Sequence, residues 1–196
     1  MKKMNYIFDL GNVLLTYQPR AYMMNMFDGD TELVDALFDL IFASEEWVMM
    51  DRGLISRVDA FERYKNKRPD LRAQIEDVQQ HIPDIFDTIP ETVQLLGELK
   101  ARGEKLYFLS NFQDELIGEV NAMYDFFKHF DGGVYSCDVK CSKPDPRIYQ
   151  MLLDNYNLKP ETCRFFDDMP ENIEGAKAMG FEGVVVSCPK DVADNV

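Results

Sequence analysis

Apolar runs alternate with amphipathic segments through most of the chain. Short runs that are apolar at nearly every position predict buried strands at 4–8, 105–110, 133–136, 163–168 and 182–187. Segments with apolar residues every three or four positions predict helices at 90–103, 114–127, 145–156 and 170–180. Strands without a polar face, separated by helices, indicate a parallel sheet covered on both faces. The pattern therefore predicts an α/β fold with a Rossmann-like core.

This alternation is interrupted between residues 16 and 87. Segments such as LVDALFDLIFAS and SRVDAFERYKN show helical spacing, and no strand pattern separates them. We interpret this stretch as an α-helical bundle inserted after the first strand. The expected organisation is a core formed by residues 1–15 and 88–196, with a helical cap at residues 16–87.

The acidic balance of the chain limits its classes of partner. Its 196 residues include 35 Asp and Glu against 21 Lys and Arg, a formal net charge of −14 at pH 7. No basic cluster is present, which argues against nucleic-acid binding. The sequence shows neither a secretion signal nor a membrane-spanning run, so we expect a cytoplasmic protein without a membrane partner. The oligomeric state is left open.

Polar residues stand near the ends of the predicted strands. The set consists of Asp9, Ser110, Asn111, Lys143, Asp167 and Asp168. The carboxyl ends of parallel strands line one edge of a sheet, and ligands bind at that edge. Any one of these residues alone is commonly a cap or a surface group. As an ordered set, they predict a site that combines carboxylates, a hydroxyl and an ammonium group.

Four segments of the sequence resemble the signatures of the haloacid dehalogenase superfamily. They are FDLGNV, LSN, KPDPRIY and FFDDMPENIEGA, and they occur in that order. The resemblance covers nearly the whole chain, and the helical insert looks like the cap of the helical-cap subgroup. Most members of the superfamily are magnesium-dependent phosphatases. FDLGNV is similar to a group of bacterial sugar-phosphate phosphatases, including ones that act on α-glucose 1-phosphate.

The resemblance implies a phosphoryl-transfer site. Asp9 is the expected nucleophile, which forms an aspartyl-phosphate intermediate. Asp9, the Gly11 carbonyl and Asp168 are the expected protein ligands of Mg²⁺, which prefers oxygen ligands. The implied substrate is a small phosphorylated metabolite, with a sugar phosphate as one candidate.

The remaining signature residues have supporting roles in this interpretation. Ser110, Asn111 and Lys143 are expected to contact the phosphate, with Lys143 supplying a point positive charge. Asp167 is expected to orient Lys143 or to lie behind the metal ligands. Asn172 stands where many relatives carry an acid, and it can bind a metal-bound water.

Gly11 is the main departure from the family pattern. Many relatives carry an aspartate two residues after the nucleophile, which protonates the leaving group and later activates water. Acid–base help of this kind is typically worth about 10²–10⁴-fold. A phosphatase without it needs an easily expelled leaving group, water, or another donor, for which the candidates are Asp51, Glu45, Glu46, His81 and Tyr17.

Two other functions stay open on the same evidence. A 2-haloacid dehalogenase also lacks the second acid, although such relatives lack the acid that this chain carries at Asp168. A non-catalytic member would bind a phosphate ligand or a protein partner. Against this function, the chain retains Asp9, Ser110, Lys143 and Asp168, and a degenerate site would be expected to have lost at least one of them. In the cap, Trp47 and Arg52 lie near Gly53 and are candidates to face the substrate. The alternative is that Trp47 packs inside the cap and that Arg52 forms an ion pair at the surface.

Overall fold

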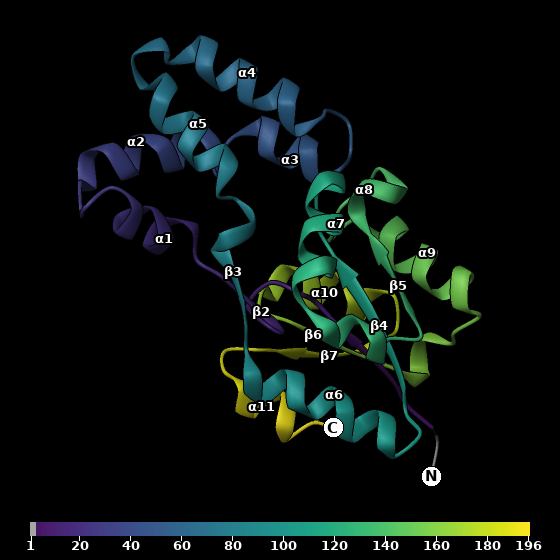
Figure 1. Ribbon diagram of the computed structural model, residues 1–196. Helices are drawn as coiled ribbons and strands as arrows, with labels where there is room; N and C mark the ends of the chain where they lie inside the picture. The colour runs from purple at the N-terminus through teal and green to yellow at the C-terminus, as the bar shows by residue number, and fades with distance from the viewer. Residues whose placement is uncertain (1–2) are drawn as a thin grey trace.

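The computed structural model describes residues 3–196, and its centre is a parallel sheet (Figure 1). Five strands pair in the order β5-β4-β1-β6-β7, and all four pairings are parallel. Their bounds are β1 Asn5–Phe8, β4 Lys105–Ser110, β5 Gly132–Tyr135, β6 Cys163–Asp167 and β7 Glu182–Val185. The predicted α/β fold is confirmed, with each predicted strand within two residues of its observed bounds.

Helices cover both faces of this sheet. One face carries α6 Pro90–Ala101, α7 Asp114–Met123, the 3-10 helix η3 Asp125–His129 and α11 Pro189–Ala193. The other face carries α9 Pro146–Tyr156 and α10 Pro170–Ala178. The short helix α8 Ser136–Val139 follows β5, and the 3-10 helix η4 Pro160–Thr162 precedes β6. Figure 1 shows α6 and α11 side by side below the sheet.

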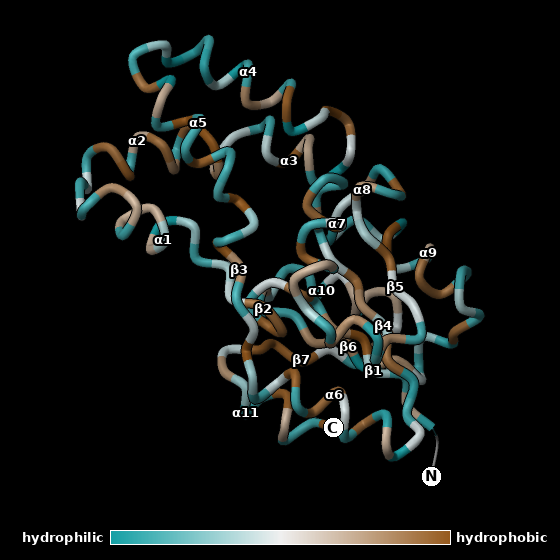
Figure 2. The backbone as a smooth tube through the Cα atoms, in the orientation of Figure 1, coloured by the Kyte–Doolittle hydropathy of each residue, from teal (hydrophilic) through white to brown (hydrophobic). Residues whose placement is uncertain are grey.

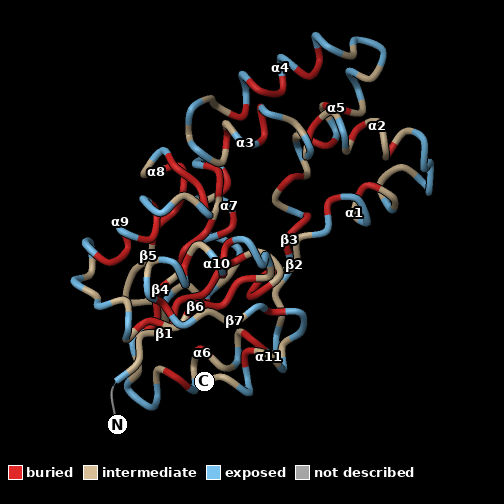
Figure 3. The backbone as a smooth tube through the Cα atoms, turned by 180° about the vertical axis from the view of Figure 1, so that it is seen from behind, coloured by how far each residue is buried: buried red, intermediate tan, exposed pale blue. Residues whose placement is uncertain are grey.

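Alternate residues of each central strand belong to different cores. Tyr6 and Phe8 pack with the α6 side, where Phe8 stacks on Phe166 at 5.1 Å between ring centroids. Ile7 and Phe165 pack with the α9 side. Because the side chains on both faces of the sheet lie in apolar cores, these strands do not alternate between apolar and polar residues. This explains their continuous apolar runs. The strands appear as brown segments in the interior of Figure 2 and as red segments in Figure 3.

Residues 16–87 form a group of helices above the sheet (Figure 1). The helices are α1 Pro19–Met26, α2 Thr31–Ile41, α3 Glu45–Asp51, α4 Arg57–Lys67 and α5 Arg72–Gln80, with 3-10 turns η1 Pro69–Leu71 and η2 Pro83–Ile85. Asp30, Ser44 and Ser56 cap α2, α3 and α4 by accepting a backbone hydrogen bond three residues on. Within the described part of the chain, no helix has the length and apolar character needed to cross a membrane.

A two-stranded ribbon connects these helices to the sheet. Strand β2, Leu15–Tyr17, pairs antiparallel with β3, Phe86–Thr88, and the rings of Tyr17 and Phe86 stack at 5.4 Å. The ribbon was not predicted from the sequence, because three residues are too few to establish a strand period. It lies where the chain enters and leaves the expected cap. The division into a core and a cap domain, with boundaries at 16 and 87, stays a prediction.

Candidate active site

Three neighbouring strands bring the signature residues together. Strand β1 lies between β4 and β6, so Asp9 after β1 has Ser110 at the end of β4 on one side. Asp167, at the end of β6, lies on the other. The backbone amide of Asp9 donates to the Phe166 carbonyl at 2.9 Å, which continues the β1–β6 pairing into the site. These strand ends border a cavity of about 230 Å³, whose far wall comes from the cap helix α3.

Lys143 is fully enclosed by acceptors. Its ammonium group lies 2.8 Å from Asp9 Oδ1 and 2.6 Å from Asp167 Oδ2, and it donates to the Leu109 carbonyl at 3.0 Å. Burial acts to lower the pKa of Lys143, but the two carboxylates outweigh it and hold this pKa above its ordinary value. Lys143 therefore stays charged and fixes the position of the Asp9 carboxylate.

Asp9 is a buried carboxylate held by two donors. The Leu10 amide donates to its Oδ1 at 2.8 Å, and the Lys143 ammonium group lies 2.8 Å from the same oxygen. Burial raises the pKa of Asp9 to about 7, and Asp167 adds to the rise, whereas Lys143 and Ser110 oppose it. Lys143 and the Leu10 amide both contact Oδ1, and Asp9 lines the cavity.

Asp167 lies behind this pair and is completely inaccessible to solvent. Besides Lys143, it accepts hydrogen bonds from the Met169 amide at 2.8 Å and from Asn172 Nδ2 at 3.0 and 3.1 Å. These contacts have the geometry that the predicted orienting role of Asp167 requires. The Asn172 amide nitrogen is thereby committed to Asp167, while Asn172 still borders the cavity.

Asp168 faces the cavity beside Asp9. Burial raises the pKa of Asp168, and a hydrogen bond of 2.9 Å from Asn12 Nδ2 opposes that rise. Asn12 was not among the predicted site residues. Its backbone is left-handed, with φ of 52°, and its Oδ1 accepts from the Tyr17 amide at 2.9 Å. The tolerance of asparagine for this conformation was the available signal in the sequence.

The carboxylates form a group with the dimensions of a cation site. Oxygen atoms of Asp9, Asp167 and Asp168 lie within 4.8 Å of one another. Lys143 is the cation bonded to this group, and it is already shared by two of the three. The donor set of hard oxygens and its uncompensated negative charge fit a divalent ion such as Mg²⁺. Asp9, Gly11 and Asp168 all line the cavity, and their role as metal ligands stays a prediction.

Asn111 holds the loop that carries Lys143. Its Oδ1 accepts from the Lys143 amide at 2.8 Å, and its Nδ2 donates to the Lys143 carbonyl at 3.3 Å. Both ends of the Asn111 amide are therefore used within the protein. Ser110 is 2% exposed and borders the cavity together with Asn111. Direct contact of either residue with a substrate stays a prediction.

The candidates for a replacement acid occupy very different places. Tyr17 and Asp51 line the cavity. Glu46 is bonded to Lys67 at 2.6 Å, Glu45 is exposed, and His81 bonds the Asp77 carbonyl at 2.8 Å. None of these last three borders the cavity.

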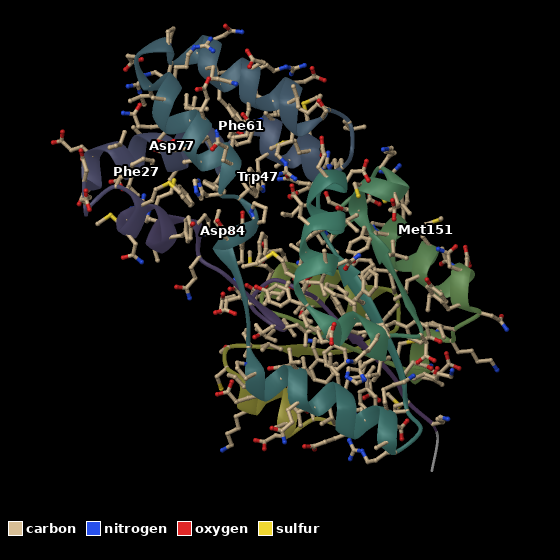
Figure 4. The ribbon with its side chains drawn as sticks, in the orientation of Figure 1. Phe27, Trp47, Phe61, Asp77, Asp84 and Met151 are labelled. Atoms are coloured by element: carbon tan, nitrogen blue, oxygen red, sulfur yellow. The ribbon has the colours of Figure 1, made fainter. Side chains whose placement is uncertain are left out.

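The cap also supplies part of the cavity wall. Trp47 packs on Phe42, with ring centroids 4.6 Å apart, and also lines the cavity, and its contact with a substrate stays a prediction. Figure 4 shows Trp47 at the side of the cap that faces the core. The interpretation of Arg52 as a surface ion-pair partner is replaced by a contact with the core, since its Nε donates to Ser142 Oγ at 3.0 Å. The wall residues missed from the sequence are Phe86, Phe112, Gln113, Leu116 and Met169.

Comparison with known proteins gives one family and two classes of enzyme within it. A family described as haloacid dehalogenase-like hydrolase matches residues 4–180. The sesquiterpene phosphatase AstK of Aspergillus oryzae is 26% identical over 91% of this chain and 87% of its own. The phosphorylated carbohydrates phosphatase of Thermotoga maritima is 25% identical over 91% of this chain and 82% of its own. The (S)-2-haloacid dehalogenase 1 of a Pseudomonas species is 29% identical over 62% of this chain and 52% of its own.

Solved structures share the fold. A family enzyme from Bacteroides thetaiotaomicron, in complex with magnesium and inorganic phosphate, superposes with a TM-score of 0.75 at 20% identity, over 93% of each chain. A dehalogenase structure superposes with a TM-score of 0.74 at 22% identity, over 94% of this chain and 85% of that one. At these identities the likeness extends to the fold and leaves the reaction to be argued from the site.

Proposed function

The chain belongs to the haloacid dehalogenase-like hydrolases, and from that premise we propose that it is a magnesium-dependent phosphatase of a small phosphorylated metabolite. The observation that carries the proposal is the group of carboxylate oxygens from Asp9, Asp167 and Asp168 within 4.8 Å of one another. Lys143 offsets one of these three carboxylate charges, so a further cation would reduce the repulsion that a phosphate dianion meets here. Displacement of a halide from carbon needs no such ion, so the extra carboxylate at Asp168 favours phosphoryl transfer.

The residues of the chain divide the work of this reaction. Asp9 attacks phosphorus, because it lines the cavity while Lys143 and the Leu10 amide hold its Oδ1 in place. Ser110 and Lys143 lie beside it and offset charge on the phosphate oxygens. A bound Mg²⁺ would offset further charge on the transferring group. The product of the first step is an aspartyl-phosphate on Asp9, which water then hydrolyses.

The cavity supports a small substrate with a partly apolar group next to the phosphate. About 230 Å³ is available, and the cavity lining includes Trp47, Phe86 and Phe112. The phosphatases similar to this chain are described as acting on a sesquiterpene and on phosphorylated carbohydrates. A sugar phosphate and a short phosphorylated alcohol are both within this range.

Phosphate release tests the proposal. The purified protein is assayed with 4-nitrophenyl phosphate and a panel of sugar phosphates, with magnesium, with a chelator, and as Asp9→Asn. We expect magnesium-dependent release that falls by at least about 10⁴-fold in the variant, because the nucleophile is lost. Halide release from 2-halo acids without metal would instead identify a dehalogenase. Phosphate binding without turnover of any ester would identify a non-catalytic member.

A further inference from the structure

The proposed phosphatase reaction needs a proton donor that Gly11 cannot provide. The leaving oxygen must take up a proton, and water must later lose one. A Cβ built at Gly11 would have Tyr17 Cβ at 3.8 Å as its nearest neighbour, so the position has room for a side chain and carries none. Among the described residues that line the cavity, two acidic groups, Tyr17 and Asp51, remain once the nucleophile Asp9 and the metal-side Asp168 are set aside.

Asp51 comes from the cap and is held firmly over the core. It is the last residue of α3, and its carbonyl accepts a hydrogen bond from Ser136 Oγ. Two residues on, the Gly53 carbonyl accepts from Lys140 Nζ at 2.8 Å. Arg52, between them, donates to Ser142 Oγ at 3.0 Å. Three consecutive residues of the cap are thus fixed to one segment of the core, and Asp51 borders the same cavity as Asp9.

Gln113 provides an independent sign of a ligand at this place. The residue is 1% exposed and lines the cavity from the core. Neither polar atom of its side chain has a hydrogen-bond partner within the part of the chain that the structure describes. An amide buried without a partner is destabilising unless a ligand completes it. The Gln113 amide lies next to Asp51 and acts to lower the pKa of that carboxyl, although no hydrogen bond is formed between the two side chains, so both belong to one subsite.

We propose that Asp51 is the proton donor to the leaving group, in place of the acid absent at Gly11, and that Gln113 binds a hydroxyl of the same leaving group. This inference rests on the proposed phosphatase function. It makes the catalytic acid a residue of the cap, so the acid is supplied only while α3 is seated on the core. The subsite suits an alcohol or sugar leaving group with at least one further hydroxyl.

The two steps balance as follows. In the first, Asp9 forms a bond to phosphorus while the bond from phosphorus to the ester oxygen breaks. The leaving oxygen keeps the electron pair and takes the proton of the Asp51 carboxylic acid. In the second, a water oxygen bonds to phosphorus, Asp51 takes one water proton, and the bond to Asp9 breaks with its electron pair returned to the carboxylate. The net reaction converts a phosphate monoester and water to an alcohol and hydrogen phosphate.

The electrostatic surroundings support Asp51 over Tyr17. Burial raises the pKa of Asp51 to about 7, the charge of Asp9 adds to the rise, and Gln113 opposes it. Burial raises the pKa of Tyr17 far above its ordinary value, and Asp51 adds to that rise. Asp9 is the ionisable group whose charge raises the pKa of Asp51, because Tyr17 and Tyr64 have raised pKa values of their own and are neutral near pH 7. A carboxyl near neutrality can both give and take a proton, whereas the phenol holds its proton too tightly.

A comparison of leaving groups tests the proposal. Asp51→Asn is assayed with glycerol 2-phosphate, whose alkoxide needs protonation, and with 4-nitrophenyl phosphate, whose phenolate does not. We expect kcat to fall by about 10²–10⁴-fold for the glycerol ester and by less than about 10-fold for the aryl ester. Equal falls for both esters, or no fall for the glycerol ester, would overturn the proposal. Glu45→Gln, an exposed acid of the same helix, is the matched control and should change neither rate.

A rescue experiment separates a catalytic role from a structural one. Gly11→Asp in the Asp51→Asn background is expected to restore the glycerol ester rate by at least about 10-fold, because it returns a carboxyl to the cavity. Gly11→Ala in that background should restore nothing, and rescue by alanine would contradict the assignment. Release that depends on Asp9 but not on Asp51 refutes this inference alone. Absence of Asp9-dependent release from either ester refutes the phosphatase function as well.

Discussion

The two sides of the cavity differ in whether their buried polar groups have partners within the protein. On the core wall, buried charges have partners within the protein: Lys143 has three acceptors, and Asp167 accepts from Lys143, Met169 and Asn172. On the side of the leaving group, Asp51 reaches the cavity through a docked turn of the cap, and Gln113, from the core, has no hydrogen-bond partner among the described residues. The core wall around Lys143 is complete before any ligand binds, whereas the leaving-group side is completed by the ligand. A fixed wall suits the phosphate, which all substrates share, and an open one suits the variable leaving group.

The largest expected effect comes from breaking the core wall. Lys143→Ala leaves Asp9 and Asp167 as buried carboxylates without their counter-charge. Removal of one partner from a buried pair typically costs about 3–5 kcal/mol of the free energy of unfolding. Urea denaturation with a chelator present measures this, and phosphatase activity should be lost in parallel. Lys159→Ala, at an exposed lysine, is the control; an unchanged urea midpoint in Lys143→Ala would show that the core wall does not depend on the lysine.

The docking of the cap should respond to a single methyl group. A Cβ at Gly53, where φ is 58°, would lie 2.6 Å from Lys140 Nζ and 2.7 Å from the Cys137 carbonyl. Gly53→Ala should cost about 2–4 kcal/mol from backbone strain and overpacking together, and it should lower kcat for the glycerol ester more than for the aryl ester. Gly29→Ala is the matched control, because φ there is 80° but no atom lies within 4 Å of a Cβ. Equal losses of stability in both variants would mean that the turn does not bear on the core.

The third expected effect is a change in the pH dependence of stability. A carboxyl whose pKa is raised on folding keeps its proton longer in the native state, so stability is highest below the unfolded pKa and falls as pH rises through the folded pKa. For Asp51 this window runs from about pH 4 to about pH 7. We therefore compare the free energy of unfolding of Asp51→Asn with that of the wild type, in the presence of a chelator. The difference should shift in favour of the variant by on the order of 1–2 kcal/mol between pH 5 and pH 8. A difference between the two proteins that is independent of pH would contradict the burial of this carboxyl.

The smallest effect is expected at Gln113, and the amide of Asn172, which has a partner, provides the contrast. Asn172→Leu removes the donor that Asp167 uses and should destabilise the protein by about 1–3 kcal/mol. Gln113→Leu removes an amide without partners, so its stability should change by less than about 1 kcal/mol or increase. Instead, KM for the glycerol ester should rise by several-fold. Thermal melts and steady-state kinetics of both variants measure this, and a reversed order of the two stabilities would remove the distinction between the two sides.

Local pattern was sufficient for the sheet and for the convergence of its polar ends. Strand β4 was predicted at its observed bounds of 105–110, because its apolar run ends sharply at Ser110. Asp9 and Asp168 were expected to meet because parallel strands place their carboxyl ends at one edge. Asp167 lies 2.6 Å from the Lys143 ammonium group, and its role in orienting Lys143 stays a prediction.

Features that depend on how two distant segments pack were not accessible in this way. Gln113 and Asp51 are more than sixty residues apart, and nothing in either local pattern shows that the cap turn descends onto the start of α7. From the sequence, Arg52 was interpreted as a surface cation, and only the structure shows its contact with Ser142. The ribbon β2–β3 is stabilised by pairing with a strand seventy residues away, and each half is too short to be seen alone.

The segment that receives the cap also leads into the lysine. Ser136, Lys140 and Ser142 bond the cap turn, and the next residue is Lys143, whose ammonium group fixes Asp9. Any free energy that couples cap closure to occupancy of the phosphate position must act equally in both directions. A ligand on Asp9 should then slow hydrogen exchange at the amides of residues 52–54, by the same factor with which a seated cap tightens that ligand. Binding of phosphate beside Asp9 would thus stabilise the cap turn at residues 52–54, which lies outside the phosphate position.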